Sequence, residues 1–437
     1  MKKIDFPDMN FFVQGIEDVK IPKMVRIREK YEDDKIDDIR AHLEGELDAL
    51  DIDKAALKGK SIAVTVGSRG IPGNDILVRT ICDKLKEWGA EPFIIPAMGS
   101  HGGGTVEGNL QIITDYGITE EAMGVPIKAS MDVVRIGTLN DGADTPVYCD
   151  KYAAEADGIV IYNKIKPHTD YKGYVESGMC KMMAIGIAKH YGCSWFHRQG
   201  FDTFAQRIPM VAEEFLNKMN VIMGIGVVQN AYDEISEIKA FPKDKIIEGD
   251  HELLQTAKRR LPRMKFDNID VLIVDRIGKN VSGAGADPNV TGRGCMPGFE
   301  DDFHCKKLLI RGLTPQSHGN ACGLGYADIT TKKCLESVDW ESTWINFSTN
   351  TMLSAGKIPV YQNTDFEAIR LAIRTCAKLN DYSKARIARL KDTLSLSEIE
   401  ISEALLPDVM GRDDVEILSE PYELKFEEDG SLKDFEC

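Results

Sequence analysis

Short apolar runs that are typical of buried strands alternate with amphipathic helical segments along most of this chain. SIAVTVG at 61–67 is a β-branched run closed by glycine, residues 74–90 have the apolar spacing of a helix, and PFIIPA at 92–97 is a second apolar run. Strands that are apolar on both faces and alternate with helices are typical of a parallel sheet covered by helices on both sides. We therefore expect an α/β fold with right-handed β-α-β connections.

The alternation continues and divides the chain in two. Further strands are predicted at 158–163, 221–228, 269–275 and in KKLLIRGL, WINFSTN and KIPVYQ, and helices over 23–50, near 105–116 and 203–218, over 364–379 and from 382 onward. We place an N-terminal α/β domain at 1–265 and a C-terminal α/β domain at 266–404. Both sheets should be mostly parallel, with the active site in the cleft between the domains and the tail 405–437 packed back on the first domain.

Composition and charge narrow the function. The formal charge of −16 and a pI near 5.1 would repel a polyanion, so nucleic acid is not an expected partner. The N-terminus lacks the unbroken apolar stretch of an export signal, and no apolar run is long enough to cross a bilayer. Ten cysteines occur singly, without a CxxC pair. We expect a cytoplasmic protein that contacts neither membrane nor nucleic acid.

Basic side chains follow the predicted strands, where open α/β sheets bind ligands. Arg69 follows the first strand, His101 lies in the glycine-rich segment GSHGGGTVEGN, His168 follows the strand at 158–163, and Lys181 and His197 lie downstream. An amine can hold an organic cofactor covalently, and an imidazole can ligate a metal or move protons. The glycine-rich segment could cradle a phosphate, although neither GxGxxG nor GxxxxGK[ST] is present there.

The order and spacing of these five residues resemble the nickel-dependent lactate racemase family, most strongly over 60–200. The resemblance implies that Lys181 anchors a nickel-pincer nucleotide covalently, that His197 ligates the nickel, and that His101 and His168 act as acid and base. It implies that Arg69 steadies the substrate, and that cofactor-building enzymes are partners in maturation. Gly186, five residues after Lys181, also matches the family pattern.

The chain departs from the family around the substrate. Cys180 and Val66 stand where an arginine and an aspartate are common, and the segment between His168 and Lys181 is longer. The polar, glycine-rich loop 276–294 resembles a family site loop, in which Lys279, Asn289 and Arg293 are the candidate substrate contacts. We therefore expect a longer or more polar 2-hydroxy acid than lactate.

The chemistry explains why such a site would need these groups. The α-hydrogen of a 2-hydroxy carboxylate is a poor acid, so its transfer as hydride to an oxidised cofactor, while a histidine removes the hydroxyl proton, is the favoured route to inversion. We expect an isomerase that racemises or epimerises a 2-hydroxy acid. The alternatives are an NAD-dependent oxidoreductase and a non-catalytic sugar-acid-binding protein. The sequence leaves the oligomeric state open, a homo-oligomer included.

Overall fold

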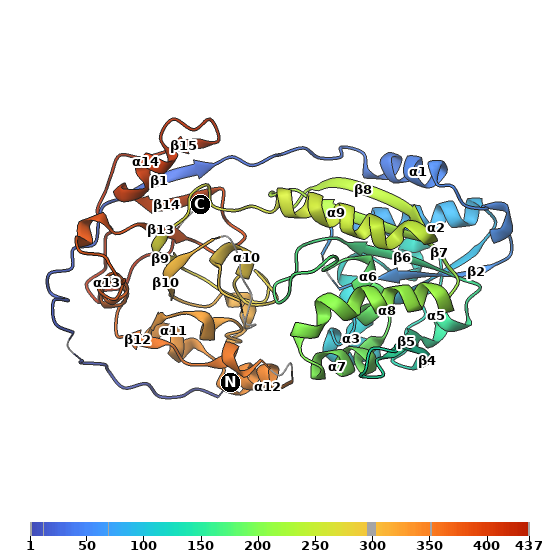
Figure 1. Ribbon diagram of the computed structural model, residues 1–437, viewed down its shortest axis with the longest axis horizontal. Helices are drawn as coiled ribbons and strands as arrows, with labels where there is room; N and C mark the ends of the chain where they lie inside the picture. The colour runs from blue at the N-terminus through green and yellow to red at the C-terminus, as the bar shows by residue number, and fades with distance from the viewer. Residues whose placement is uncertain (1, 12, 69, 295–302, 350–351, 436–437) are drawn as a thin grey trace. The chain divides into compact units, whose positions relative to one another are not determined.

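The computed structural model describes residues 2–11, 13–68, 70–294, 303–349 and 352–435. The chain forms two compact units: unit 1 contains residues 1–31 and 262–437, and unit 2 contains residues 32–261. Each unit combines helices with one main sheet whose central strands are parallel (Figure 1). The predicted α/β class, with mostly parallel sheets, is confirmed.

Unit 2 is built on a five-stranded sheet in the order β3-β2-β6-β7-β8. Strands β3, β2, β6 and β7 are parallel, and β8 is antiparallel to β7. A separate antiparallel pair is formed by β4 and β5. The strands are β2 (Ser61–Val66), β3 (Glu91–Pro96), β4 (Val133–Thr138), β5 (Pro146–Asp150), β6 (Gly158–Lys164), β7 (Val221–Gln229) and β8 (Ile235–Pro242).

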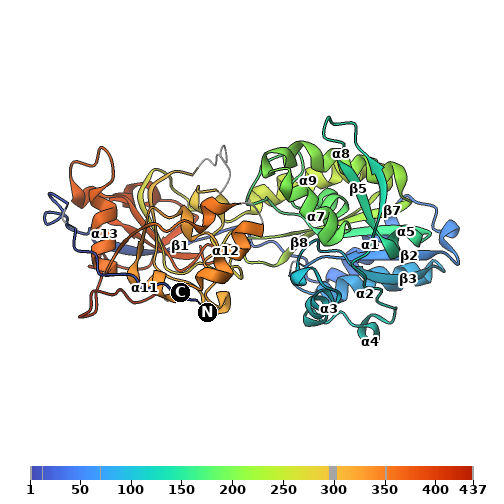
Figure 2. The ribbon, with the colours of Figure 1, turned by 90° about the horizontal axis from the view of Figure 1, so that it is seen from below.

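Helices cover both faces of this sheet because its central strands are apolar on both sides. In Figure 2, α8 and α9 lie on one face and α2 on the other. The helices are α1 (Ile39–Ala49), α2 (Asn74–Glu87), α3 (Val106–Asp115), α4 (Glu120–Met123), α5 (Lys151–Glu155), α6 (Met179–Lys181), α7 (Lys189–Arg198), α8 (Phe204–Lys218) and α9 (Ile246–Arg260). A π-helical turn over Met182–Gly186 joins α6 to the segment before α7.

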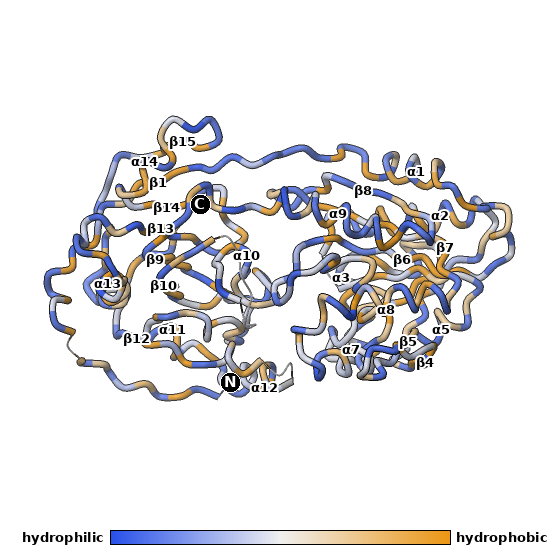
Figure 3. Tube along the Cα trace, viewed as in Figure 1, coloured by the Kyte–Doolittle hydropathy of each residue, from blue (hydrophilic) through white to orange (hydrophobic). Residues whose placement is uncertain are grey.

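Unit 1 is built on an eight-stranded sheet in the order β12-β11-β10-β9-β13-β14-β1-β15. The first five strands in this order, from β12 to β13, pair in parallel. The pairs β13–β14, β14–β1 and β1–β15 are antiparallel. The central strand β9 is buried along its whole length and lies in a hydrophobic part of the trace in Figure 3. The strands are β1 (Met24–Glu29), β9 (Ile269–Val274), β10 (Cys305–Ile310), β11 (Ile329–Thr331), β12 (Val360–Gln362), β13 (Ile387–Leu390), β14 (Glu398–Ser402) and β15 (Val415–Ile417).

The helices of unit 1 are shorter on average than those of unit 2. They are α10 (Pro288–Thr291), α11 (Lys332–Ser337), α12 (Trp340–Thr349), α13 (Asp365–Arg374) and α14 (Leu406–Val409). Among the residues that the structure describes, every helix is too short or too polar to traverse a bilayer.

The two units differ from the predicted domains at both chain ends. The predicted boundary at 265/266 lies four residues from the observed division, but residues 1–31 group with unit 1 because β1 pairs with β14 and β15. The tail 405–437, predicted to pack on the first domain, also lies in unit 1, where Tyr422 pairs with Met24. Pairing between distant strands decides both placements, and local periodicity carries no information about it.

Three local predictions were wrong. Residues 24–29, predicted as helix, form β1, and 387–390, predicted as helix, form β13. In both cases ladder pairing outweighs a weak helical pattern. WINFSTN, predicted as a strand, lies mostly in α12. This helix begins directly after Asp339, whose side chain accepts the Ser342 N–H and so satisfies one amide of the first turn.

A buried network of charges ties the C-terminal tail to the sheet of unit 1. Asp275, directly after β9, pairs with Arg311 at 2.7 Å and Arg389 at 2.7 Å. Arg311 also pairs with Asp365, and Arg389 with Glu400, each at 2.8 Å. The backbone N–H groups of Leu432 and Phe435 donate to Asp365 and Asp275. Since each charge is paired, the network stabilises the tail at the carboxyl ends of β9 and β10.

Breaking this network should therefore cost far more than breaking an exposed ion pair. We expect Arg389→Met to lower the free energy of unfolding by about 3–5 kcal/mol, because Asp275 and Glu400 lose a partner while still buried. Lys384→Met, which removes an exposed pair with Asp381, is the matched control and should leave the midpoint unchanged. Urea denaturation measures both, and equal midpoints for the two variants would contradict the assignment.

Candidate active site

Three neighbouring strands of unit 2 carry the candidate residues just beyond their carboxyl ends. The sheet order β3-β2-β6 places the segments after Pro96, Val66 and Lys164 at one edge. His101 follows β3 and His168 follows β6, while Arg69, in the turn after β2, lies outside the described residues. The carboxyl edge of a parallel sheet is the usual ligand-binding edge of such folds.

The glycine-rich loop that carries His101 turns tightly before it enters α3. The ring Nδ1 of His101 contacts the Ser68 hydroxyl across the edge, and the Tyr116 hydroxyl donates to the Ser68 carbonyl at 2.7 Å. Gly102 has a φ of +64°, and a Cβ there would lie 2.5 Å from the backbone of Gly108. Only glycine fits where the backbone at 102 passes the backbone at 108, which explains why this loop is rich in glycine.

His168 is held by backbone hydrogen bonds on a loop that is pinned to α9. Its own N–H donates to the Glu176 carboxylate at 2.7 Å, and Glu176 pairs with Lys258 of α9 at 2.7 Å. The ring Nδ1 of His168 accepts the N–H of Asp170 at 3.0 Å. His168 is 7% exposed, and its ring packs against Tyr171 with ring centroids 4.4 Å apart. The orientation of the imidazole is thus fixed from three sides.

Lys181 ends α6 and points its amine at His168. The Lys181 Nζ contacts His168 Nε2 directly. The start of α6 is held by Asp250 of α9, whose Oδ2 accepts the Cys180 N–H at 2.6 Å. A Cβ at Gly178 would lie 2.0 Å from Asp250 Oδ1, so glycine is needed for this approach. The π-helical turn that follows Lys181 is a feature often found at functional sites.

His197 lies in the last turn of α7, with one ring nitrogen committed to the backbone. Its Nδ1 donates to the Cys193 carbonyl at 2.8 Å and lies 3.5 Å from the Cys193 Sγ. Burial lowers the pKa of His197, but the contact with Cys193 raises it by more, so the net direction is upward. The rings of Phe201 and Phe204 flank it at 5.2 and 5.5 Å. None of the described residues is placed to hydrogen-bond Nε2, which is the nitrogen suited to a metal.

Contacts between these segments gather the four described residues into one cluster. Gly99 donates to the Gly186 carbonyl at 3.1 Å, and the Cys193 Sγ lies 3.6 Å from Ser100 Oγ, which joins the His101 loop to α7. The Phe201 ring lies between the two imidazoles, 5.2 Å from His197 and 6.3 Å from His168. His101, His168, Lys181 and His197 therefore share one edge of unit 2, which we call the basic cluster.

A fully buried ion pair supports the helix that carries His197. Lys189, the first residue of α7, pairs with Asp150 at 2.8 Å, with both side chains 0% exposed, and its Nζ also donates to the Pro96 carbonyl. Lys189 has a φ of +55°, a strained conformation for a side-chain-bearing residue. The pair thereby joins α7 to the ends of β3 and β5.

The three candidates from the loop 276–294 lie in unit 1, where two of them have structural contacts. Lys279 is exposed. The amide of Asn289 donates to Asp287 at 2.8 Å, and Arg293 bonds the Cys305 carbonyl at 3.0 Å and Asp328 at 3.1 Å. Asn289 also lines a groove of about 510 Å³. A substrate role for these three residues stays a prediction.

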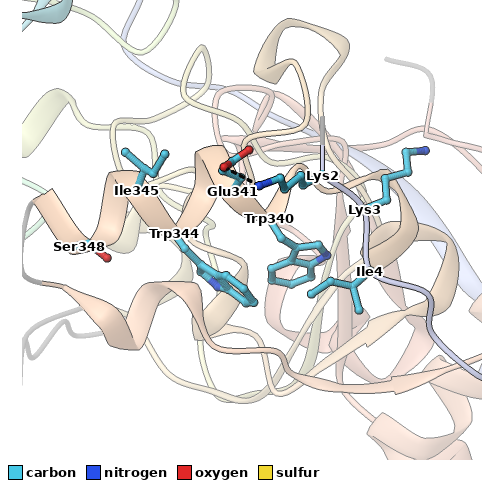
Figure 4. A pocket seen from close by; sticks show the side chains of 8 residues that line it. All are labelled: Lys2, Lys3, Ile4, Trp340, Glu341, Trp344, Ile345 and Ser348. Atoms are coloured by element: carbon cyan, nitrogen blue, oxygen red, sulfur yellow. Dashed lines mark hydrogen bonds and ion pairs between the residues drawn. The ribbon is translucent and has the colours of Figure 1, made fainter.

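Another groove of unit 1, about 670 Å³, lies on α12 (Figure 4). Trp340 and Trp344 form its floor beside Ile4, and Lys2 pairs with Glu341 at 2.9 Å. Trp344 lines this groove, and neither groove contains a residue of the basic cluster.

Sequence reasoning missed several residues that position the cluster. Cys193 could have been found from its spacing of four from His197 on one helix. No sequence pattern indicates the roles of Ser68, Asp250 and the Glu176–Lys258 pair, because their contacts join segments that are distant in the chain. Cys180 is buried, and burial raises the pKa of its thiol well above its usual range, so it has a structural role.

Comparison with known proteins points to one family for the N-terminal half. Residues 12–207 match the model of the lactate racemase N-terminal domain, a range that contains the whole basic cluster and Arg69. The solved structure of the lactate racemase apoprotein from Thermoanaerobacterium thermosaccharolyticum is 14% identical, with a TM-score of 0.48, over 88% of this chain and 96% of that one. No curated protein matches the chain significantly. The family match supports the predicted resemblance for 12–207; cofactor, mechanism and substrate stay predictions.

The buried Asp250 should give the protein a specific pH dependence of stability. Burial raises its pKa from 3.8 to about 6. The native state therefore binds a proton that the unfolded state releases between pH 4 and 6, and stability falls as the pH rises through that window. Between pH 4 and pH 7 we expect the wild type to lose about 2.4 kcal/mol relative to Asp250→Asn, which cannot titrate.

Urea midpoints at pH 4, 5, 6 and 7 measure this difference. Asp51→Asn, at an exposed position, is the matched control and should keep the wild-type slope. Parallel pH profiles for the wild type and Asp250→Asn would show that Asp250 does not titrate in this range.

Proposed function

We propose that this protein is an isomerase that racemises or epimerises a 2-hydroxy acid, with a nickel-pincer nucleotide attached to Lys181 and His197 as a nickel ligand. The observation that carries the proposal is the basic cluster itself. One strand edge brings together four groups. The Lys181 amine contacts the His168 imidazole, His197 bonds a backbone carbonyl through Nδ1, and His101 lies on the adjacent loop. The family match over 12–207 supports the same reading.

The residues of the cluster fit such a cofactor. Among the described residues, no group of three or more His, Cys, Asp or Glu side chains is placed to hold a bare metal ion, so the cluster suits a metal that arrives within an organic ligand. His197 donates Nδ1–H to a backbone carbonyl, which fixes the tautomer that leaves Nε2 for the metal. When bound, the cofactor would supply an acceptor for the α-hydrogen of the substrate. Phe201 and Phe204 would keep water from this part of the site.

The two remaining histidines would move the hydroxyl proton. The hydroxyl of a 2-hydroxy acid points to different sides in the two stereoisomers, so two bases at different positions serve both directions. His168 is oriented by Asp170 and Tyr171, and His101 by Ser68. Ordinary imidazoles are substantially neutral near pH 7, as this role requires.

Local charge favours an acidic substrate in a chain that is acidic overall. The segment 164–180 contains three lysines against Asp170 and Glu176, and Glu176 is already paired with Lys258. A positive region in an otherwise negative protein attracts carboxylates. We propose a longer or more polar acid than lactate, contacted also by Arg69 and by residues such as Lys279. Cofactor-building enzymes would be partners in maturation, and association into a homo-oligomer is compatible with the proposal.

The decisive experiment follows the α-hydrogen. Protein produced together with cofactor-building enzymes is incubated with a panel of enantiopure, α-deuterated 2-hydroxy acids. The products are separated by chiral chromatography, and their deuterium content is measured by mass spectrometry. We expect inversion with the deuterium retained, because hydride transfer and return does not exchange with solvent. Loss of deuterium would exclude the proposed route, and a requirement for added NAD would favour the oxidoreductase.

Variants assign the roles within the cluster. Lys181→Ala should remove both the covalent adduct and activity, and Lys181→Arg, which keeps the charge, should behave in the same way. His101→Ala and His168→Ala should each lower kcat by about 10²–10⁴-fold, the usual size of a general acid–base contribution. Full activity with Lys181→Ala would contradict the proposal.

A further inference from the structure

The chain passes between its two units twice, and one buried carboxyl group connects the two segments of unit 1 that lead to these passages. The first segment ends at Tyr31, and the chain returns at Pro262. Glu29, the last residue of β1, is 0% exposed. Its Oε1 accepts the backbone N–H of Lys265 at 2.8 Å, and its Oε2 accepts the Tyr31 hydroxyl at 2.5 Å. Glu29 therefore bonds both segments at once.

Tyr31 extends this connection. Its hydroxyl lies 3.1 Å from the Arg263 carbonyl, and the centre of its ring lies 4.8 Å from Lys265 Nζ. The ring also packs against the core of unit 1 that contains Phe266. The buried Glu29 carboxyl thus lies where the two segments meet at the border of this core.

The neutral form of Glu29 suits this position better than the ionised form. A protonated carboxyl keeps one oxygen to accept the Lys265 N–H, and its own O–H can donate to the Tyr31 hydroxyl. A carboxylate keeps two hydrogen bonds but buries a full charge, which is costly. Burial is the largest effect on Glu29 and raises its pKa from 4.5 to about 7.

The charged and titratable groups that face Glu29 partly oppose one another. Lys265 and the Tyr31 hydroxyl favour the carboxylate, whereas Asp414 disfavours it. Asp414 pairs with Lys265 at 3.2 Å and with Arg412 at 2.8 Å. Each of these effects on Glu29 is smaller than that of burial, and the neutral acid therefore persists to near neutral pH.

We propose that Glu29 is a proton-controlled latch on the two passages between the units. The neutral carboxyl holds the segments 29–31 and 263–265 together, and its ionisation releases them so that water reaches the charge. The latch lies in unit 1 and does not depend on the proposed isomerase function.

On the unit 2 side, an exposed ion pair joins the same two passages. Arg260 pairs with Asp34 at 2.5 Å, and the Asp34 side chain is 50% exposed. Water and salt screen such a pair, so it contributes little to stability. The pair therefore provides a matched control for the buried contact at Glu29.

Hydrogen–deuterium exchange of the full chain at single-residue resolution tests the proposal. The probe is the Lys265 N–H, which exchanges when its bond to Glu29 opens. Opening returns the Glu29 pKa from about 7 to its ordinary 4.5, so a rise in pH favours the open form. Between pH 6 and pH 8 we expect the protection factor, corrected for the intrinsic pH dependence of exchange, to fall about tenfold. The Asp275 N–H, bonded to the Leu390 carbonyl at 2.9 Å, should stay protected throughout.

Matched variants assign the effect. Glu29→Gln keeps the shape of the side chain and an oxygen for the Lys265 N–H but cannot titrate, so its protection factor should not change with pH. Asp34→Asn weakens the exposed pair and should retain the wild-type fall.

Three results would overturn the proposal. One is a constant protection factor at Lys265 in the wild-type protein, a result that needs no variant. Another is a fall that persists in Glu29→Gln. The third is exchange of the Asp275 N–H in parallel with that of Lys265, because the carboxyl would then act on the whole fold. Since neither cofactor nor substrate takes part, each outcome is separate from the test of isomerase activity.

Discussion

The site depends on the parallel pairing of β3, β2 and β6. Parallel hydrogen bonding brings the carboxyl ends of these strands to one edge, as the pairing of Val66 with Pro96 shows. His101 and His168, separated by 67 positions in the chain, reach the same region only through this register. A slip of one residue would turn the side chains of a strand to the opposite face and disperse the cluster. Every chemical property discussed above therefore follows from a backbone arrangement.

Buried polar contacts then set the orientation of each group. Asp250 fixes the start of α6, the Glu176–Lys258 pair fixes the loop of His168, and the Lys189–Asp150 pair fixes the start of α7. Burying a charge is costly, and breaking such a pair is costlier still, so these contacts tolerate little movement. Two of the three come from α9, so a helix that contributes no residue to the basic cluster determines where Lys181 and His168 lie.

The sequence predicted the α/β class, most of the parallel strands and the approximate position of the cluster. It succeeded there because β-branched runs, helical periodicity and strand-end placement are local signals. It failed for β1 and the tail because their partners are hundreds of residues away. It also could not predict the contact of His168 with Lys181. Their spacing of thirteen is known from the chain, but their direction depends on Asp170, Glu176 and α9.

The two units use the same structural edge in different ways. In unit 1, Asp275 and Arg311 directly follow β9 and β10, where a ligand could bind, but they pair with each other and hold Leu432 and Phe435 of the chain's own tail. In unit 2 the corresponding edge carries histidines and a lysine, with the Lys181 amine against His168 and His197 bonded to a backbone carbonyl. A charge that is neutralised by a buried partner stabilises the fold, whereas titratable groups gathered at a strand edge are typical of functional sites. This difference is the physical reason for assigning the chemistry to unit 2.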